Sequence, residues 1–247
     1  MNDLSNCFFC KVPLQTKTVR EDFYRCPLCG TMYRTNQKDW SSYINGDFRK
    51  DYEKQVSQIM KNDRGHYQRI SQRHEIKRLV YIKEFRNVHS FGGGMPKLES
   101  LLPCKSITVY DVNADIYDGS VPEFRSLYPI RNTPVVFKNA MVDAELIKSI
   151  PVTSDDLFTF VHFLEHIDAS DVRNILDAIP SGVTVLIYQP NVSRGSSPGW
   201  FHYSDQHITL VAGHKMLEFV RLWYDSVVTT FCEVDEDFLL VFEKPIK

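Results

Sequence analysis

The chain has 247 residues, of which 43% are hydrophobic and 24% are charged, and its formal net charge is −2. This length and composition suffice for a sizeable core and allow two units, a small one and one of about 160 to 200 residues. The slight negative charge argues against a protein that coats nucleic acid, and no stretch approaches the length of a membrane-spanning helix. The N-terminus carries Asp3 and Asn6 where a secretory leader needs a cationic and then an apolar stretch, so we expect a reducing, cytoplasmic location and no membrane partner.

Two pairs of cysteines lie within the first thirty residues. Cys7 and Cys10 form one CxxC pair, Cys26 and Cys29 form the other, and fifteen residues separate the pairs. Cysteines three positions apart on a tight turn aim both sulfurs at one ion, and Gly30 after the second pair is free to adopt a positive φ. The spacing predicts a zinc ribbon in which four thiolates hold one structural Zn²⁺.

Other roles for these four cysteines fit less well. Disulfides or buried thiols are the alternative, but paired CxxC motifs in a chain without a secretory leader favour a metal. The remaining cysteines, Cys104 and Cys232, lie in apolar runs and are predicted to be small core residues. Because four thiolates leave no open coordination position, we expect the zinc to stay out of the reaction and the ribbon to be separable from the rest of the chain.

Residues 41–86 are predicted to form a linker followed by a basic amphipathic helix. Apolar residues recur at helical spacing among charges, which places the helix at about residues 64–85. Between residues 48 and 86, eleven Lys or Arg residues stand against five Asp or Glu residues, a net charge of +6. A solvated helix face explains these charges, and contact with a phosphate-bearing substrate is the alternative.

Short β-rich runs alternate with helix-like stretches in the rest of the chain. Five of them predict parallel strands joined by crossover helices, at residues 88–91, 107–111, 135–138, 157–161 and 183–188. Two further runs, 227–234 and 238–242, are separated by three residues only. This connection is too short for a crossover, so the two runs are expected to pair as an antiparallel hairpin.

A glycine-rich turn follows the first of these strands. Gly92, Gly93 and Gly94 let the backbone approach a ligand at the carboxyl end of the sheet, where doubly wound folds bind cofactors. Asp111 ends the second strand seventeen residues after Gly94, and a carboxylate there can accept both hydroxyl protons of a ribose. These residues predict a nucleoside site, unless Asp111 is an ordinary turn residue at a strand end.

Three segments resemble motifs of the class I S-adenosylmethionine-dependent methyltransferases. Residues 88–94 (VHSFGGG) resemble the first motif, residues 156–167 (DLFTFVHFLEHI) the fourth-strand segment, and residues 181–191 (SGVTVLIYQPN) the fifth strand with its Pro-Asn end. The resemblance implies an α/β fold, a Rossmann-like seven-stranded sheet with an antiparallel terminal hairpin, plus the small N-terminal zinc ribbon. It divides the chain into a zinc ribbon at 1–40, a linker and basic helix at 41–86, and a methyltransferase domain at 87–247.

The resemblance also implies S-adenosylmethionine as a cofactor and a set of residues around it. The residues expected at the cofactor are Phe91, Gly92, Gly93, Gly94, Asp111, Val112, Asn139 and His162. Asp143 is an alternative to Asn139 beside the adenine. Ser90 stands where the family usually has an acidic residue, and Pro96 where a third glycine often falls.

Methyl transfer is an in-line displacement, so the protein mainly positions two reactants, and a hydroxyl acceptor also needs a base. The resemblance places this base in the loops after the fourth and fifth strands. His207 and His202 are the preferred pair, and His166 is a further candidate. Together with Glu165, His162 and His166 can form a partial site for a divalent ion, or they cap the start of a helix.

The predicted function is transfer of a methyl group from S-adenosylmethionine to a small-molecule or nucleotide-linked sugar acceptor, and a phosphorylated or nucleotide-linked small molecule is one such acceptor. One alternative is an rRNA or tRNA methyltransferase whose zinc ribbon grips RNA, which the overall acidity of the chain disfavours. The other alternative is a degenerate methyltransferase fold that acts only as a binding module, which Ser90 and Pro96 favour.

Overall fold

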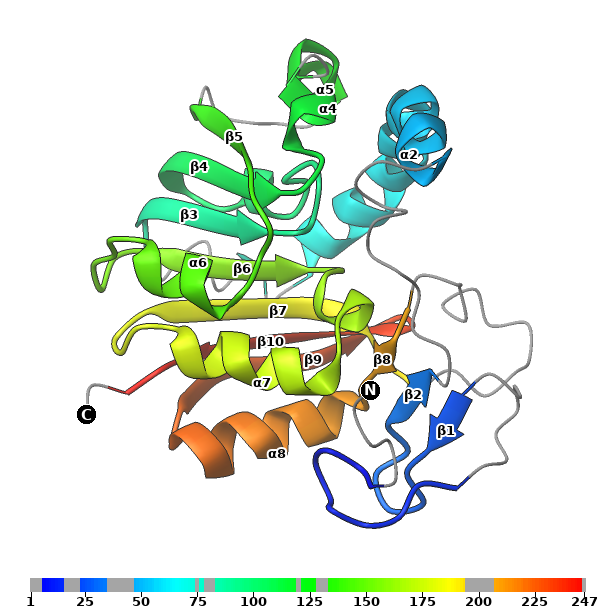
Figure 1. The fold of residues 1–247 in the computed structure, drawn as a ribbon. Coiled ribbons are helices and arrows are strands. Elements are labelled where there is room, and N and C mark those ends of the chain that lie inside the picture. The colour runs from blue at the N-terminus through cyan, green and yellow to red at the C-terminus, as the bar shows by residue number, and fades with distance from the viewer. Residues whose placement is uncertain are drawn as a thin grey trace.

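The computed structural model describes residues 6–15, 23–34, 47–73, 76–77, 83–118, 121–127, 133–193 and 207–245. Within these ranges the chain forms a seven-stranded α/β sheet covered by helices, with a small N-terminal unit at one end of the sheet (Figure 1). None of the helices in these ranges has the length and the apolar character needed to cross a membrane.

Seven strands form the central sheet in the order β5-β4-β3-β6-β7-β10-β9. Their bounds are Phe85–Phe91 for β3, Cys104–Asp111 for β4, Val135–Asn139 for β5, Leu157–Val161 for β6, Thr184–Pro190 for β7, Val227–Val234 for β9 and Asp237–Glu243 for β10. The first five run parallel, whereas β10 is antiparallel to both β7 and β9. The prediction of seven strands that end in an antiparallel hairpin is confirmed.

The parallel strands all end at one edge of the sheet, on the side to which their arrowheads point in Figure 1. β10 enters the sheet at this same edge because it runs antiparallel to β7, and Asp237 pairs with Pro190 at the end of β7. Ligands of open α/β sheets bind outside the carboxyl ends of the strands. This edge is therefore where a site is expected.

Two layers of helices cover the sheet. One face carries α6 (Ala144–Ser149), α7 (Ala169–Ala178) and α8 (Gly213–Tyr224), and the other carries α2 (Asp47–Gln72), α4 (Ala114–Asp118) and α5 (Val121–Leu127). In β6, Phe158 and Phe160 enter the core under the first layer, whereas Leu157 and Val161 enter the core under the second. The period of two residues in a strand thus supplies both apolar faces.

The basic helix begins earlier in the chain than the sequence predicted. α2 covers Asp47–Gln72 and so shares residues 64–72 with the helix predicted at about residues 64–85. Ile76 and Lys77 are also helical, whereas Phe85 is the first residue of β3. The first half of α2 is mostly polar, so its apolar period is weak, yet Val56 and Met60 are buried against the sheet layer. Tertiary packing thus stabilises helical residues that the apolar periodicity of the sequence does not predict.

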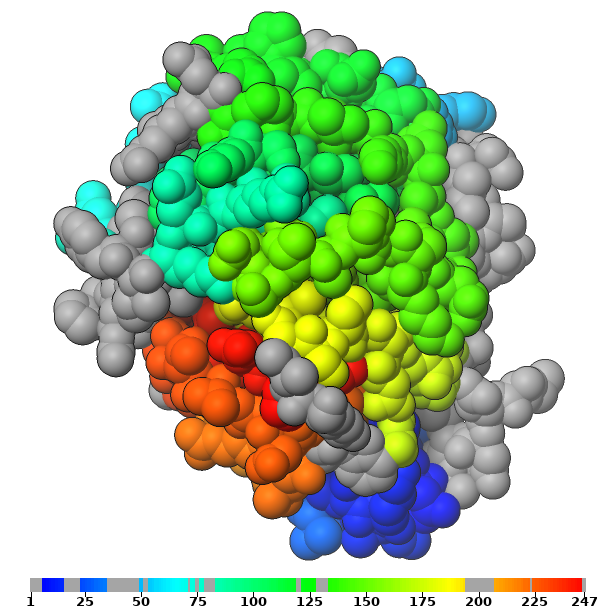
Figure 2. Space-filling view, turned by 90° about the vertical axis from the view of Figure 1, so that its left-hand side faces the viewer, coloured from blue at the N-terminus to red at the C-terminus, as the bar shows by residue number. Residues whose placement is uncertain are grey.

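The N-terminal unit shares a small sheet with a segment from far along the chain. Its strands are β1 (Phe23–Arg25) and β2 (Met32–Arg34), and β2 pairs antiparallel with β8 (Thr209–Leu210). The unit also contacts α8, since the ring centroids of Phe9 and Phe219 lie 5.4 Å apart, and Figure 2 shows the blue N-terminal residues against the orange ones. The ribbon is therefore packed against β8 and α8, and its separability from the rest of the chain stays a prediction.

A buried carboxyl group lies beside Ser90. Glu99, in the short helix η1 (Glu99–Leu101), is 1% exposed, and its Oε1 accepts hydrogen bonds from Ser90 Oγ at 2.7 Å and Thr159 Oγ1 at 2.6 Å. Burial raises the pKa of Glu99 above its ordinary value, although these hydrogen bonds oppose the shift. An acidic group absent at position 90 is thus present nine positions later, inside the core.

We predict that Glu99→Gln raises the free energy of unfolding at pH 7 by on the order of 1 kcal/mol. Because burial raises the pKa of Glu99, the folded protein binds this proton more tightly than the unfolded chain does. The resulting stabilisation is complete below the ordinary value of 4.5 and is lost as the pH rises through the folded value. Urea unfolding of both proteins over this range should show a difference in stability that widens with pH, and parallel curves would contradict the assignment.

Candidate active site

A cavity of about 890 Å³ opens at the carboxyl edge of the central sheet. Its walls come from the turn after β3, the ends of β4 and β6, the first residue of β10, and side chains of α2, α6 and α7. Ligand sites typically have volumes of about 300–1,000 Å³. The cavity is large enough for a nucleoside cofactor together with a small acceptor.

The glycine turn forms one wall of this cavity. Gly92 and Gly94 adopt φ values of 64° and 66°, a region that side chains rarely allow. A Cβ atom on Gly92 would lie 1.9 Å from the Phe163 ring, so no side chain fits there. The Gly92 N–H donates to the Tyr110 carbonyl at 2.8 Å, which ties the turn to β4. The bare backbone of the turn is thereby held where a ligand can approach it.

Asp111 stands at the end of β4 and faces the same cavity. It is 7% exposed, and its Oδ1 accepts the N–H of Asn113 at 2.8 Å. Burial raises the pKa of Asp111, and backbone hydrogen bonds from Asn113 and Gly94 oppose that shift. A hydroxyl donor from a ligand would stabilise this poorly hydrated carboxylate further.

Of the other residues predicted at the cofactor, Val112 and His162 line the cavity together with the three glycines. Phe91 does not line it with its side chain. It is fully buried, and its ring stacks on that of Tyr110 at 5.3 Å. Phe91 therefore supports the turn from within the core.

Asn139 and Asp143, the two candidates beside an adenine, lie in different places. The Oδ1 of Asn139 accepts the N–H of Asp115 at 3.1 Å, and Asn139 is not among the residues that line the cavity. Asp143 lines it and caps α6, because its Oδ1 accepts the Leu146 N–H at 2.8 Å. The structure thus places Asp143, and not Asn139, at the cavity.

Three of the polar residues predicted near the reaction form a cluster at the short helix η2 (Leu164–His166). The ring centroids of His166 and His207 lie 4.9 Å apart, and the ligand atoms of Glu165, His166 and His207 lie within 4.8 Å of one another. All three side chains line the cavity. This set of one carboxylate and two imidazoles suits either proton transfer or a divalent cation. His202, the fourth predicted histidine, lies outside the described residues.

His162 takes a different position from the one predicted for a metal ligand. Its Nδ1 lies 3.2 Å from Glu165 Oε1, and its Nε2 lies 3.8 Å from Asp237 Oδ2. Burial lowers the pKa of His162, but the hydrogen bond with Glu165 and the charge of Asp237 outweigh burial and raise it. His162 also has a φ of 50°, an uncommon conformation of the kind that collects at functional sites. His162 lies between two carboxylates, and His207 takes the place predicted for His162 beside Glu165 and His166.

His66 of α2 faces the cavity from the opposite helix layer. The Tyr188 hydroxyl donates to Asp237 Oδ2 at 2.8 Å, and His66 Nε2 lies 3.0 Å from the same hydroxyl oxygen. A phenol has one hydrogen, so His66 must donate through Nε2 and keep Nδ1 as an acceptor. Burial lowers the pKa of His66, although the charge of Asp237 opposes this. The pKa values of His66 and His162 are thus shifted in opposite directions.

The described wall of the cavity is strongly acidic. One lysine lines it, Lys97, and it pairs with Asp63. Seven carboxylates line it, namely Asp63, Asp111, Asp143, Glu145, Glu165, Asp171 and Asp237. Even with four histidines present, this wall favours a ligand that carries positive charge.

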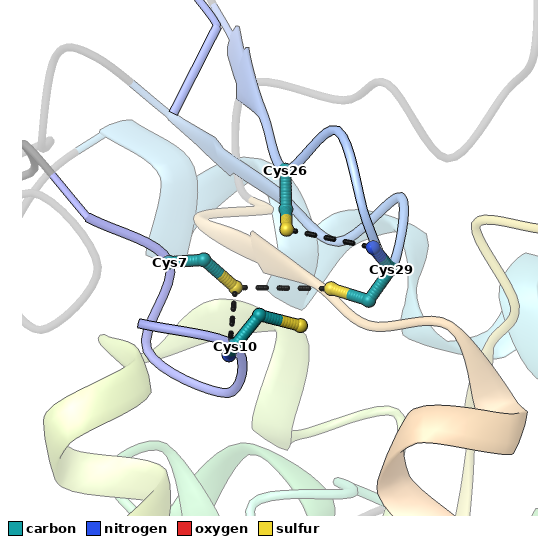
Figure 3. Close-up of side chains that lie close together, drawn as sticks. All are labelled: Cys7, Cys10, Cys26 and Cys29. Carbon is teal, nitrogen blue, oxygen red and sulfur yellow. Dashed lines mark hydrogen bonds between the residues drawn. The ribbon is translucent and has the colours of Figure 1, made fainter. Parts of the chain in front are cut away.

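The four cysteines of the N-terminal unit form a second cluster (Figure 3). Their sulfur atoms lie within 4.8 Å of one another, and the sulfurs of Cys7 and Cys29 are 3.7 Å apart. Tetrahedral bonds of about 2.3 Å to one zinc ion would separate the sulfurs by roughly 3.8 Å. The N–H groups of Cys10 and Cys29 point at Cys7 Sγ and Cys26 Sγ, at 3.4 and 3.5 Å. The cluster has the dimensions of a four-thiolate metal site.

The electrostatics of this cluster also suit a cation. A hydrogen bond from Cys29 lowers the pKa of the Cys7 thiol to about 4, against the effect of burial, and the shared proton raises the pKa of Cys29. A thiolate is thus favoured at Cys7, in a largely buried place. A bound divalent ion would neutralise it and stabilise the remaining thiolates.

The sequence did not single out His66, Tyr188 or Asp237 as site residues. His66 lies on a helix whose polar residues were interpreted as a solvated face, and Tyr188 lies 122 residues away from it. The available signal was the antiparallel hairpin, since a strand that enters the sheet beside β7 brings its first residue, Asp237, to the carboxyl edge.

Neither a protein-family model nor a curated protein sequence matches this chain. Solved methyltransferase structures do share its fold. An O-methyltransferase family protein from Burkholderia thailandensis has a TM-score of 0.59 at 14% identity, over 84% of this chain and 63% of its own. An O-methyltransferase family 2 protein from Planctomyces limnophilus, in complex with apigenin, has a TM-score of 0.54 at 12% identity, over 78% and 61%. This chain thus spans less than two thirds of the length of either protein.

Another similar structure is a complex of DhpI with SAH, with a TM-score of 0.52 at 12% identity, over 81% of this chain and 96% of that one. At these identities the likeness shows the fold alone. The chain therefore has the Rossmann-like fold of S-adenosylmethionine-dependent methyltransferases, as its three sequence motifs predicted.

We predict that His162 titrates above the ordinary histidine pKa of 6.5 and His66 below it. Burial opposes the charge on both rings, but His162 alone hydrogen-bonds a carboxylate. Proton–nitrogen NMR titration should give this order and should show the His66 proton on Nε2. Glu165→Gln should lower the pKa of His162 and change that of His66 less, with His66→Asn and His162→Asn as assignment controls. An unchanged His162 pKa in Glu165→Gln would contradict this account.

Proposed function

We propose that this chain is an S-adenosylmethionine-dependent methyltransferase that acts on a small-molecule acceptor. One observation carries the proposal. A glycine turn without side chains, a strand-end aspartate and a cluster of imidazoles and carboxylates face one cavity at the carboxyl edge of a sheet with an antiparallel terminal hairpin. The first two features suit a nucleoside, and the third suits the chemistry of an acceptor.

The cavity residues fit the cofactor in shape and in charge. When bound, S-adenosylmethionine supplies an electrophilic methyl group on a sulfonium. Asp111 would accept the ribose hydroxyls, Gly92 and Gly94 would leave room for the rest of the nucleoside, and Asp143 would lie beside the base. The sulfonium and the ammonium group are both cations, which suits a wall with seven carboxylates and one lysine.

The acidic cavity wall also favours some classes of acceptor over others. A phosphorylated or nucleotide-linked acceptor would bring negative charge against these carboxylates, and in the described wall only Lys97 and the histidines could offset it. A neutral or basic acceptor with a hydroxyl or an amine fits better. The cavity volume of about 890 Å³ also favours a small molecule over RNA, which needs an extended basic surface.

His207 is the proposed base, with His166 beside it. The two rings face the cavity next to Glu165, whose Oε2 has no hydrogen-bond partner among the described residues. Burial raises the pKa of Glu165, but the hydrogen bond with His162 and the charges of the three nearby histidines lower it to about 2. An ionised carboxylate at this position would stabilise an imidazolium that forms as an acceptor proton is taken up.

The four cysteines are proposed to hold one structural Zn²⁺. Cys7, Cys10, Cys26 and Cys29 offer a closed set of four sulfurs, so no coordination position is left for a substrate. The ion would act through the fold of the ribbon and not as a Lewis acid in the reaction.

We predict that Asp111→Ala weakens S-adenosylhomocysteine binding by about 1.5–3 kcal/mol, or roughly 10- to 150-fold, the loss expected for a charged hydrogen-bond partner. Calorimetry measures the affinity directly and needs no acceptor. Asp155→Ala is the matched control, because Asp155 is an exposed carboxylate just before β6, at the opposite edge of the sheet. Equal affinity in the two variants would place the ribose elsewhere.

The reaction itself is tested by release of S-adenosylhomocysteine from S-adenosylmethionine in the presence of phenols, amines, sugars, nucleotide-linked sugars and RNA. We predict turnover with a neutral or basic small acceptor. With that acceptor, His207→Ala should lower kcat by about 10²–10⁴, because a positioned base typically contributes this much. The exposed His214 of α8 provides the control variant His214→Ala, which should retain activity. Tight cofactor binding without turnover on any acceptor would favour the binding-module alternative.

A further inference from the structure

Ile208 is held from two sides by backbone hydrogen bonds. Its N–H donates to the Glu165 carbonyl at 2.7 Å, and its carbonyl accepts the Arg34 N–H at 2.8 Å. Glu165 belongs to the cavity wall, whereas Arg34 belongs to β2 of the ribbon. The residue directly after His207 therefore joins the ribbon to the candidate active site.

β8 depends on the ribbon for its strand pairing. Within the described residues β2 is its ladder partner, with Met32 opposite Leu210, and β8 does not belong to the central sheet. Leu210 is fully buried in an apolar cluster that also contains Phe23 and Met32 of the ribbon. A strand of two residues is not stable without such partners. Removing β2 would expose both the backbone and the apolar face of β8.

Tyr33 links this pairing to the cysteine cluster. Its backbone lies opposite Thr209 of β8. Its hydroxyl oxygen lies 3.4 Å from Cys7 Sγ and accepts the Phe8 N–H at 3.1 Å. Tyr33 is 3% exposed, so its ring is fixed between the two knuckles and β8. Tyr33 therefore contacts both the cysteine cluster and β8.

The ribbon has little apolar core of its own. The buried residues around the sulfurs are three of the cysteines, Tyr33 and Ala169, and Ala169 belongs to α7. A unit of this size needs a metal or disulfides to fold, and binding of a structural zinc ion is largely folding free energy. The central sheet, by contrast, has two extensive cores that contain no residue of β2.

We infer that the ribbon is a positioning element of the active site, in which metal held by the four cysteines keeps β2 in place and β2 keeps β8 and His207 in the cavity wall. This inference rests on the proposed zinc site and on the proposed role of the cavity. The metal would thus control the acceptor side of the site without contact with any reactant. Asp111 and the glycine turn, which are built on the central sheet, would keep their geometry when the metal is lost.

Hydrogen–deuterium exchange with mass spectrometry tests the inference without any acceptor. Full-length protein is compared with and without one equivalent of Zn²⁺, the latter after treatment with a zinc chelator, and with Cys26→Ser. Exchange in residues 208–211 and 32–34 should become at least about tenfold faster on metal loss, while β3, β6 and β7 keep their protection. Re-addition of Zn²⁺ should restore slow exchange, and the affinity for S-adenosylhomocysteine should change by less than about threefold.

Cys232→Ser is the matched control, since Cys232 lies on β9 away from the cluster and should leave zinc content and exchange unchanged. Continued protection of residues 208–211 in metal-free protein would overturn the inference, and so would loss of protection across β3, β6 and β7. Elemental analysis that finds no zinc would instead remove the proposed metal site. Failure of the zinc-loaded protein to bind S-adenosylhomocysteine would count against the proposed methyltransferase function. The exchange rates at β8 would still show whether metal binding by the ribbon orders β8.

Discussion

The parallel alignment of β3, β4 and β6 is the constraint on which the candidate site depends. Parallel strands place their carboxyl ends side by side at spacings of about 4.8 Å, so Asp111, Gly92 and His162 stand in a row along one edge of the sheet. β10 adds Asp237 to this row because it runs in the opposite direction and enters where the others end. The order of the strands therefore sets the order of these residues along the edge.

Charge in the cavity is organised around partly or fully buried carboxylates. Glu165 and Asp237 stand on either side of His162, and the Tyr188 hydroxyl links Asp237 to His66. Placing so many ionisable groups out of water is costly unless each has a partner, which explains why the carboxylates and imidazoles lie within contact distance of one another. The desolvation of these charged groups therefore opposes folding. The cavity wall is suited to a cationic ligand, whose binding would return some of the lost electrostatic stabilisation.

The described residues of the N-terminal unit do not line this cavity, but Arg34 is hydrogen-bonded to Ile208, the residue after the cavity residue His207. Ile208 has its two backbone groups bound to Glu165 and Arg34, so a buried segment between η2 and β2 satisfies its hydrogen bonds in both directions. The aromatic contacts of Phe8 and Phe9 with Phe219 add a second attachment, on α8. The pairing of β2 with β8, together with the hydrogen bond between Arg34 and Ile208, connects the N-terminal unit to the segment that follows His207.

Features that depend on near neighbours could be predicted from the sequence. The CxxC spacing indicated the cysteine cluster, the three glycines indicated the turn, and the short connection after Val234 indicated an antiparallel hairpin; the bounds of β6 and β9 agree with the predicted runs. Each of these rests on the period of a strand or on the reach of a few residues of backbone. The start of α2 was predicted too late because burial of Val56 and Met60 in the core, and not a strong apolar period, stabilises the first half of the helix.

The contacts that assemble the site were decided by the tertiary structure. His66 and Tyr188 are 122 residues apart, and β2 and β8 come from opposite ends of the chain. No spacing rule relates such residues, because a contact between them exists only when helices, strands and ribbon pack together in one arrangement. The sequence by itself therefore determined which chemical groups are present and which local turns carry them. The packed fold decided which of those groups face one another, since burial, hydrogen bonding and charge act through distances in space and not along the chain.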